Sequence, residues 1–363
     1  MFQADRFYNL MVESMKKFSL LLMVVVAMMA LVSCGGASKK TEANGEEKKE
    51  CCLPVGLQLY TVRDDMAKDF KGTLQQVKAM GYEGVEFAGL FGHAPADIKA
   101  WCAEIGLNPI SAHVPLAEML EDIDKVIADY KAIGCEYIVV PYVTEERRPG
   151  GELFNQMVEE IRTIGQKCKE AGLVLLYHNH DFEFQKTESG EFGLDYLYAN
   201  VPADLLQTEL DQCWVKYAGQ DPVAYLQKYE GRSPVVHLKD YYASGEQKED
   251  PYALIGLNEG EKKENKAFEF RPLGYGVQDI PAIVRASKAA GSKWLIVEQD
   301  QPSMGKTALE CAAMSMEFIK QMQADGTCCS EKGHGEGHNH EHNHAHGEGC
   351  THSHGADCNH NHK

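Results

Sequence analysis

Residues 177–184 read Tyr-His-Asn-His-Asp-Phe-Glu-Phe and place several possible metal ligands and proton carriers in one short segment. The segment follows Ala-Gly-Leu-Val-Leu-Leu at 171–176, an apolar run typical of a buried strand. His178 and His180 are two residues apart, so on a strand both side chains point to the same face. Imidazole and carboxylate groups bind divalent transition metals and also carry protons. The segment therefore predicts a metal or catalytic site at the end of a strand.

The same kinds of residue end other short apolar runs of the chain. They are Glu86, His113, the pair Glu209 and Asp211, the pair His237 and Lys239, and the pair Glu298 and Asp300. Any one pair alone is typical of a solvated strand end. Taken together, they would repel one another or lose solvation badly unless a cation organised them.

The elements that would carry these residues alternate along the chain between β-type runs and amphipathic helices. Strands are predicted at 55–60, 84–87, 110–113, 137–141, 173–178, 206–211, 235–239 and 294–298. Helices are predicted at about 69–80, 95–105, 118–133, 151–171, 193–199, 221–229, 279–290 and 305–323, and a polar loop at 241–276. Gly81, Gly106, Gly134, Gly172 and Gly291 follow the helices in the manner of C-cap glycines.

Eight such units with short turns predict a single (β/α)8 TIM barrel over 53–326. No Gly-x-Gly-x-x-Gly follows the first strand, so nothing supports a dinucleotide-binding fold. In a barrel the carboxyl ends of the strands carry the chemistry, and the polar residues above would meet on the barrel axis. Mixed nitrogen and oxygen donors suit one divalent ion such as Mn, Zn, Co, Mg, Fe or Ni, with open positions for substrate oxygens.

The ordered set of short motifs resembles the sugar phosphate isomerase/epimerase superfamily, whose barrel is xylose isomerase-like. The motifs are Gly-Leu-Gln-Leu-Tyr at 56–60, Gly-Tyr-Glu-Gly-Val-Glu at 81–86, Ser-Ala-His at 111–113, Tyr-His-Asn-His at 177–180, Glu-Leu-Asp at 209–211, His-Leu-Lys-Asp at 237–240, Gly-Tyr-Gly at 274–276 and Val-Glu at 297–298. The resemblance implies a divalent ion held by Asp211, His237 and Glu298. It places His178 at the fourth position, where the family commonly has a glutamate.

That departure bears on the reaction that the resemblance implies. Epimerases of the family use glutamates of strands five and eight as a pair of bases, and here Glu298 is the one that remains. His178, His180, Glu183 or Lys239 would supply a second proton relay, or the site has a single base. Three further residues, Glu86, His113 and Glu209, are expected to contact substrate.

The leading hypothesis is a metal-dependent isomerase or epimerase that acts on a non-phosphorylated sugar or keto-sugar through an enediolate. The alternative reaction is that of a lyase or hydratase acting on 3-keto-sugars or keto-glycosides. An alternative of another class is a tethered protein that binds sugar or metal. Loss of turnover on chelation would distinguish an enzyme from a binding protein.

The two ends of the chain predict localisation and accessory metal binding. Met15-Lys16-Lys17, an apolar run to Val32 and Ser33-Cys34-Gly35 resemble a lipoprotein signal over 1–34 with Met15 as its start. The alternative is a transmembrane anchor. A flexible tether at 35–52 would then hold the barrel in the bacterial cell envelope, facing the periplasm. The His/Cys-rich tail at 327–363 is expected to bind extra metal ions or to be a chain without a core.

Composition narrows the partners further. The formal net charge of −18 argues against nucleic acid and against anionic lipid surfaces, so membrane association is expected only through the lipid anchor. The cysteines at 102, 135, 168, 213 and 311 are widely scattered through the barrel, which suggests small core residues rather than a disulfide framework.

Overall fold

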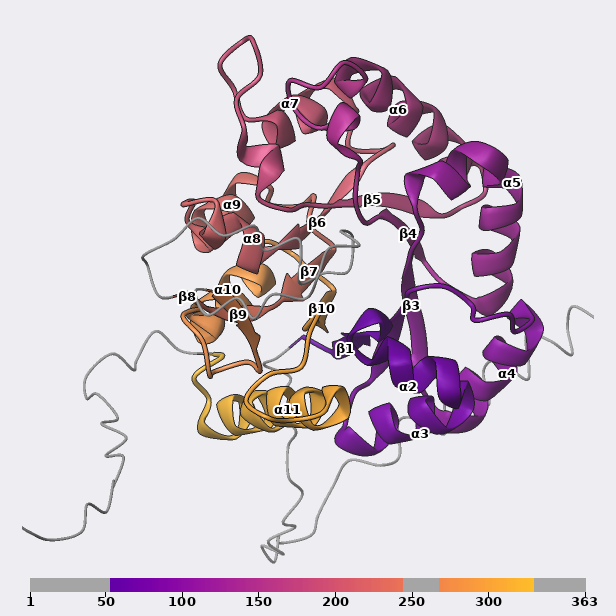
Figure 1. Cartoon of the computed structure of the whole chain (residues 1–363), viewed down its shortest axis with the longest axis vertical. Coiled ribbons are helices and arrows are strands. Elements are labelled where there is room, and N and C mark those ends of the chain that lie inside the picture. The colour runs from indigo at the N-terminus through magenta and orange to yellow at the C-terminus, as the bar shows by residue number, and fades with distance from the viewer. Residues whose placement is uncertain (1–52, 244–267, 330–363) are drawn as a thin grey trace, which may run out of the picture. The chain divides into compact units, whose positions relative to one another are not determined.

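The computed structural model describes residues 53–243 and 268–329. Eight parallel strands close into a barrel in the order β1-β10-β7-β6-β5-β4-β3-β2, and Figure 1 shows the helices arranged around them. The barrel strands are β1 (Val55–Gln58), β2 (Gly84–Phe87), β3 (Asn108–His113), β4 (Tyr137–Val140), β5 (Val174–His178), β6 (Gln207–Asp211), β7 (Val235–Leu238) and β10 (Trp294–Val297). The predicted (β/α)8 fold is confirmed.

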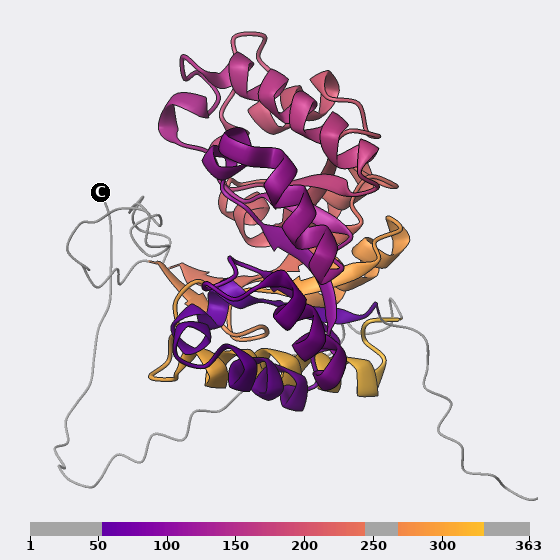
Figure 2. The ribbon, with the colours of Figure 1, turned by 90° about the vertical axis from the view of Figure 1, so that its right-hand side faces the viewer.

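The outer layer consists of helices that pack an apolar face against the strands. They are α2 (Arg63–Lys68), α3 (Phe70–Met80), α4 (Pro95–Ile105), α5 (Leu116–Ile133), α6 (Phe154–Glu170), α7 (Gly193–Asn200), α8 (Gln212–Tyr217), α9 (Pro222–Lys228), α10 (Ile280–Ala289) and α11 (Ala308–Asp325). The last helix returns to the start of the barrel, where α11 lies beside α3 (Figure 2). All five glycines predicted to end helices have positive φ, from 78° to 111°.

The barrel interior is filled below the strand ends by a small apolar layer. It consists of Ile110, Tyr137, Val139, Leu176, Val235 and Ile296, all buried. Gly56 and Gly84 make room for it, because a Cβ on either would lie 2.6 Å from Cδ1 of Ile110. This layer closes the barrel, so the polar residues collect above it at the carboxyl ends of the strands.

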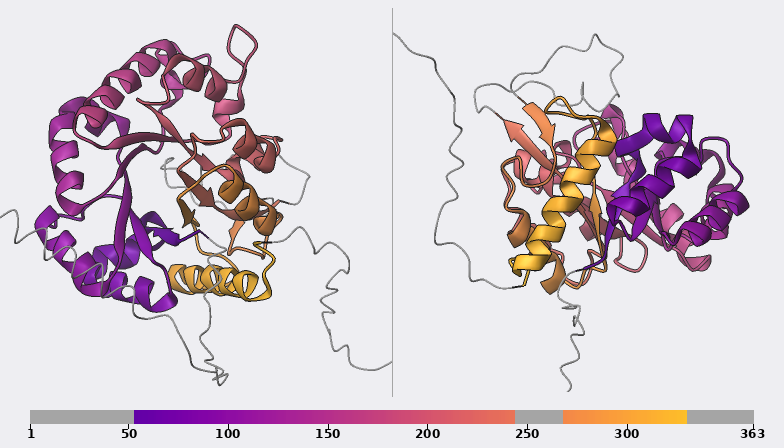
Figure 3. Two further views of the ribbon diagram at one scale, coloured as in Figure 1. Left: turned by 180° about the vertical axis from the view of Figure 1, so that it is seen from behind. Right: turned by 90° about the horizontal axis from the view of Figure 1, so that it is seen from below.

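The structure differs from the sequence prediction after the seventh strand. Part of the predicted loop at 241–276 belongs to a two-stranded sheet, in which β8 (Asp240–Ala243) pairs with β9 (Phe268–Arg271) in antiparallel fashion. The prediction was wrong there because β8 follows β7 after one residue and its partner lies far along the chain. Figure 3 (right) shows these two strands beside the barrel. Phe268 and Phe270 of β9 are buried against Trp214 of α8.

Smaller differences concern helices. The short helices α2 and α8 were not predicted, and α11 begins at Ala308 rather than 305. Thr307 caps α11: its side chain accepts from the Glu310 backbone N–H, while the Glu310 side chain accepts from that of Thr307. The structure describes no helix that is both long enough and apolar enough to span a membrane.

Several predictions fall on the ends of the chain. The signal segment, the tether and residues 330–363 of the tail lie outside the described residues. Three residues of the predicted tail, 327–329, are described: Cys328 is buried and Thr327 accepts a hydrogen bond from Arg285 at 2.7 Å. The cysteines at 102, 135, 168, 213 and 311 are free and buried, as predicted.

Candidate functional site

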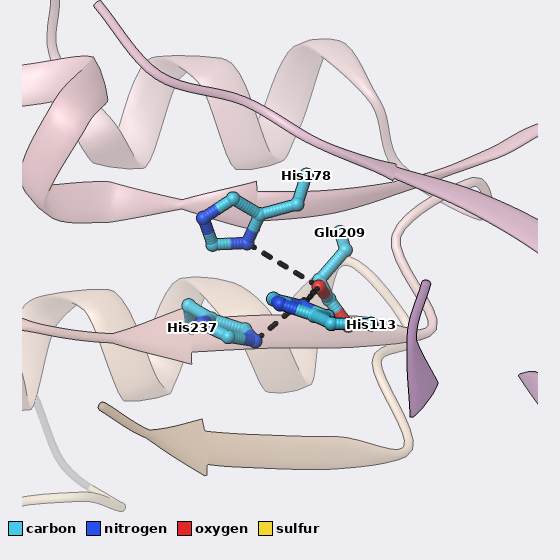
Figure 4. A group of neighbouring side chains, drawn as sticks. All are labelled: His113, His178, Glu209 and His237. Carbon is cyan, nitrogen blue, oxygen red and sulfur yellow. Dashed lines mark hydrogen bonds and ion pairs between the residues drawn. The ribbon is translucent and has the colours of Figure 1, made fainter. Parts of the chain in front are cut away.

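The predicted site residues come together at the carboxyl ends of the strands. His113, His178 and Asp211 are the last residues of β3, β5 and β6, and Glu298 directly follows β10. Neighbouring strands align these ends, because Asp211 pairs with His237 and His178 pairs with Glu209 across the sheet. Figure 4 shows three histidines of three strands gathered around the Glu209 carboxylate.

Four of these residues form a compact set of donor atoms. His178, Asp211, His237 and Glu298 each offer one ligand atom, all within 4.8 Å of one another, and all four are buried. Asp211 Oδ2 has no hydrogen-bond donor within the described residues, and it lies 3.5 Å from Nε2 of His178. His237 Nδ1 lies 3.1 Å from Oε2 of Glu298. A buried carboxylate oxygen that accepts no hydrogen bond and lies among imidazole nitrogens would be satisfied by a divalent cation, so the residues fit such an ion. We call these four residues the donor set.

A second layer of carboxylates lies behind the histidines of the donor set. Glu209 Oε2 is 3.3 Å from Nδ1 of His178, 3.3 Å from Nε2 of His237 and 2.7 Å from Nε2 of His113. His237 Nε2 also lies 2.8 Å from Oε1 of Glu86. Each donor-set histidine thus turns one ring nitrogen to the donor set and the other to a buried carboxylate. For His237, whose Nε2 makes a hydrogen bond with Glu86, this is the arrangement in which a carboxylate fixes the tautomer of a metal-ligating histidine.

Burial and charge set the protonation of the three rings differently. Burial lowers the pKa of His178 well below its usual value, so this ring is neutral and able to bind a metal. Burial also lowers the pKa of His113, but Glu86 and Glu209 outweigh it and raise the pKa to about 10. Against burial, the same carboxylates raise the pKa of His237. A metal at Nδ1 of His237 would compete with that proton.

Lys239 supplies a second buried positive charge. Its Nζ lies 2.6 Å from Asp300 Oδ2, 3.0 Å from Glu298 Oε2 and 3.6 Å from Asp211 Oδ2. Burial lowers the pKa of Lys239, yet these carboxylates outweigh that effect and raise it above its usual value. The lysine therefore keeps its proton and places it beside two members of the donor set.

A large cavity opens onto this cluster. Its volume is about 1100 Å³, and predicted site residues that line it are His113, His178, His180, Lys239, Glu298 and Asp300. Glu86, Glu209 and Glu183 are buried and are not among its lining residues. The substrate contacts predicted for Glu86 and Glu209 stay predictions, and their position favours a role behind the histidines.

Glu183 lies behind His180 in the turn that follows β5. Its carboxylate accepts hydrogen bonds from the Tyr177 hydroxyl at 2.7 Å and from the backbone N–H of His180 at 2.8 Å. Burial raises the pKa of Glu183 to about 8. His180 itself stacks on the ring of Phe182, with centroids 5.4 Å apart, and faces the cavity.

Several supporting residues were not singled out from the sequence. Gln58 and Ser111 donate to the Glu86 carboxylate at 2.7 and 2.5 Å, and Asn179 accepts from the backbone N–H of Asp211 at 3.0 Å. Asp240 accepts from the backbone N–H groups of Gly274, Gly276 and Gln278 at 3.0–3.1 Å. The quoted motifs contained all four, but only their partners in space reveal what each side chain holds in place.

Comparisons with known proteins agree with this architecture. A family model described as xylose isomerase-like TIM barrel matches residues 74–322. No curated protein matches the sequence. A sugar phosphate isomerase/epimerase of Parabacteroides distasonis is 22% identical, with a TM-score of 0.58, covering 74% of this chain and 98% of its own.

Two more distant structures share the fold. A probable 3-DHS dehydratase of Bacillus anthracis is 15% identical with a TM-score of 0.58, covering 74% of this chain and 99% of its own. The IOLI protein, solved with a bound zinc atom, is 17% identical with a TM-score of 0.56, covering 75% of this chain and 99% of its own. At these identities the likeness establishes the barrel, and the chemistry has to be argued from the site.

Proposed function

The chain belongs to the xylose isomerase-like TIM barrel family, and from that premise we propose that it is a divalent-metal-dependent isomerase or epimerase of a non-phosphorylated sugar or keto-sugar. One observation carries the proposal: four buried donors from four successive barrel strands converge, and two of them, His178 and Glu298, line a cavity of about 1100 Å³. Open coordination positions facing a cavity belong to catalytic metal sites rather than to closed structural ones.

The donor set would bind the ion, and the carboxylates of Glu209 and Glu86 would orient the histidines of the donor set. Glu86 would accept the outward N–H of His237, and Glu209 Oε2 lies 3.3 Å from the outward nitrogen of both His178 and His237. His113, held by both carboxylates, balances their charge. When bound, a divalent ion supplies positive charge beside a substrate carbonyl and so acidifies the neighbouring C–H.

The chain's own residues would then handle the proton. Glu298 and Asp300 present carboxylates to the cavity, and Lys239 Nζ bridges them at 3.0 and 2.6 Å. Lys239 is protonated and donates a proton to a substrate oxygen, while Glu298 accepts a proton from a substrate carbon. His180 faces the same cavity from the end of β5 and is the second candidate proton carrier.

A lyase or hydratase reaction is the second candidate, and one observation favours it. Both strand-end carboxylates that face the cavity, Glu298 and Asp300, follow the same strand, β10. Strand β5 offers His178 and His180 in place of a carboxylate. A site whose carboxylate bases lie on one side of the substrate suits elimination as well as it suits epimerisation. It equally suits isomerisation, in which one base removes a proton and returns it to a different atom.

The substrate and location follow from the predicted lipoprotein signal. A barrel tethered outside the cytoplasm would meet free sugars, keto-sugars and glycosides rather than sugar phosphates. We place the protein in the bacterial cell envelope, lipid-anchored and facing the periplasm, with the His-rich tail as a further metal-binding segment.

Proton exchange in deuterated water tests the proposal. Free sugars and keto-sugars are incubated with the enzyme, and NMR follows the loss of carbon-bound protons and the appearance of products. We expect exchange that stops on chelation and returns with added divalent ion. An epimer or isomer supports the first reaction, and a dehydrated product supports the second. Binding of sugar without exchange or product would instead identify a binding protein.

A further inference from the structure

The cavity is larger than a single sugar needs. Pockets of roughly 300–1,000 Å³ enclose drug-sized ligands, and this one measures about 1100 Å³. Its polar residues near the donor set, His180, Lys239 and Asp300, can serve one sugar ring. The remaining space extends over the loops that follow β2 and β4 and over α5, because these segments supply most of the other lining residues.

This second part of the cavity has an apolar wall. Leu90 and Phe91 supply it from the loop after β2, and Pro115, Leu116 and Leu120 supply it from the start of α5. We call these five residues the apolar arm. Phe91 is 38% exposed and Leu120 43% exposed, which makes them two of the few large apolar side chains that the described residues leave in solvent. Exposed apolar side chains that line one cavity mark a ligand surface.

The backbone of Phe91 also indicates a function. Its φ is +51°, a value that residues other than glycine rarely adopt. Such a conformation persists only where neighbouring structure holds it, and it concentrates at ligand sites. Here the Phe91 ring lies edge-on to the Phe70 ring, with ring centroids 6.0 Å apart. The Phe70 ring in turn packs against Trp101, with ring centroids 5.8 Å apart. An aromatic cluster thus supports the loop that presents Phe91 to the cavity.

We propose that the apolar arm binds a second ring, joined to the reacting sugar by a glycosidic bond. The inference rests on the proposed function and specifies its substrate as a glycoside. A glycosidic bond locks the anomeric carbon, so the carbonyl that acidifies a C–H must then be a ketone within the ring. The substrate class is therefore a keto-glycoside. Its second ring, an aromatic aglycone or another sugar, lays an apolar face on Phe91 and Leu120.

Matched probes test this inference on the full-length enzyme. They are 3-keto-D-glucose, phenyl 3-keto-β-D-glucopyranoside and 3-keto-cellobiose, each assayed for metal-dependent proton exchange and, by calorimetry, for binding. We expect kcat/KM and affinity to favour at least one of the two glycosides by roughly 10-fold or more. Preference for the phenyl compound identifies an aromatic aglycone, and preference for 3-keto-cellobiose a second sugar.

Variants assign the preference to the arm. Phe91→Ala and Leu120→Ala should each reduce the preference, measured as kcat/KM for the glycoside divided by kcat/KM for the free keto-sugar, toward one. Phe91→Gly, which suits the positive φ, should do the same, and this separates loss of the ring from a change in the loop. Tyr275→Ala removes an exposed ring that does not line the cavity and should keep the ratio.

Two outcomes overturn the inference. One is equal calorimetric affinity of the wild-type enzyme for the free keto-sugar and both glycosides. The other is an unchanged preference in all three arm variants. Either result leaves the proposed function standing if exchange on free sugars depends on metal. Absence of exchange on every sugar, together with a clear calorimetric preference for a glycoside, would contradict the proposed enzymatic function. The same result would still support binding of a glycoside by the apolar arm.

Discussion

At the scale of single residues, Glu209 connects three imidazole rings through one oxygen. His113, His178 and His237 all approach its Oε2 within 3.3 Å. The carboxylate is buried and does not line the cavity. Its effect on chemistry would therefore pass through the rings that it orients.

Glu209→Gln should weaken binding of the divalent ion by about 10–100-fold, because a neutral amide holds the histidine tautomers less firmly. Competition with a chromophoric chelator measures the affinity. Glu183→Gln is the matched control, since Glu183 is equally buried but contacts Tyr177 and the backbone of His180 instead. Equal metal affinity in the wild type and Glu209→Gln would contradict the positioning role.

Glu183 should make stability depend on pH. Its pKa is raised by burial from 4.5 to about 8, so between these values the folded chain holds a proton that the unfolded chain releases. The free energy of unfolding therefore falls as pH rises through this window, by up to about 1.4 kcal/mol per pH unit. Glu183→Gln keeps a neutral group and lacks that slope.

Urea unfolding at pH 5.5 and pH 7.5 measures the difference between the two proteins. We expect Glu183→Gln to gain roughly 2–3 kcal/mol relative to the wild type between these two values. Parallel pH profiles for the two proteins would show that Glu183 is ionised in the folded state.

At the scale of elements, Asp240 ties β8 to the loop before α10. Its carboxylate accepts hydrogen bonds from three backbone N–H groups within residues 274–278. Asp240 directly follows Lys239 in the sequence. At Gly276 a Cβ would lie 2.2 Å from Asp240 Oδ1 and 2.4 Å from the Tyr241 carbonyl oxygen. The glycine is required because the loop backbone passes so close to the strand.

Gly276→Ala should therefore lower the free energy of unfolding by about 1–3 kcal/mol, since overpacking forces the backbone to shift. Thermal unfolding followed by circular dichroism measures it. Tyr275→Ala, at a half-exposed neighbour, should change stability by less than about 0.5 kcal/mol. Equal stability of Gly276→Ala and the wild type would mean that the loop is not held against Asp240.

The elements also explain what the sequence could and could not predict. Strands of a parallel barrel are buried on both sides, so they appear as apolar runs, and the C-cap glycines separate them from helices. At β8 and β9 the sequence shows neither a continuous apolar run nor a C-cap glycine that separates a strand from a helix. Within the site, Glu209 and Asp211 point the same way, and their order along the strand decides which is closer to the cavity. Sequence spacing gives the shared face, whereas depth and partners come only from the three-dimensional arrangement.

At the scale of the whole molecule, the barrel should fold and turn over without its tail. Cys328 is buried against the barrel and Thr327 accepts from Arg285, so a deletion should begin after Cys329. We expect removal of 330–363 to leave Tm and kcat nearly unchanged when metal is saturating. A large loss of kcat under those conditions would show that the tail takes part in turnover.

Metal content tests the central claim, that His178, Asp211, His237 and Glu298 hold a divalent ion. Mass spectrometry of the wild type, Asp211→Ala, His178→Ala and His180→Ala gives the ions bound per chain, with thermal unfolding as a check that each variant folds. We expect Asp211→Ala and His178→Ala to contain about one ion fewer than the wild type, and His180→Ala to keep it. Retention of the full metal content by folded Asp211→Ala and His178→Ala would contradict the account.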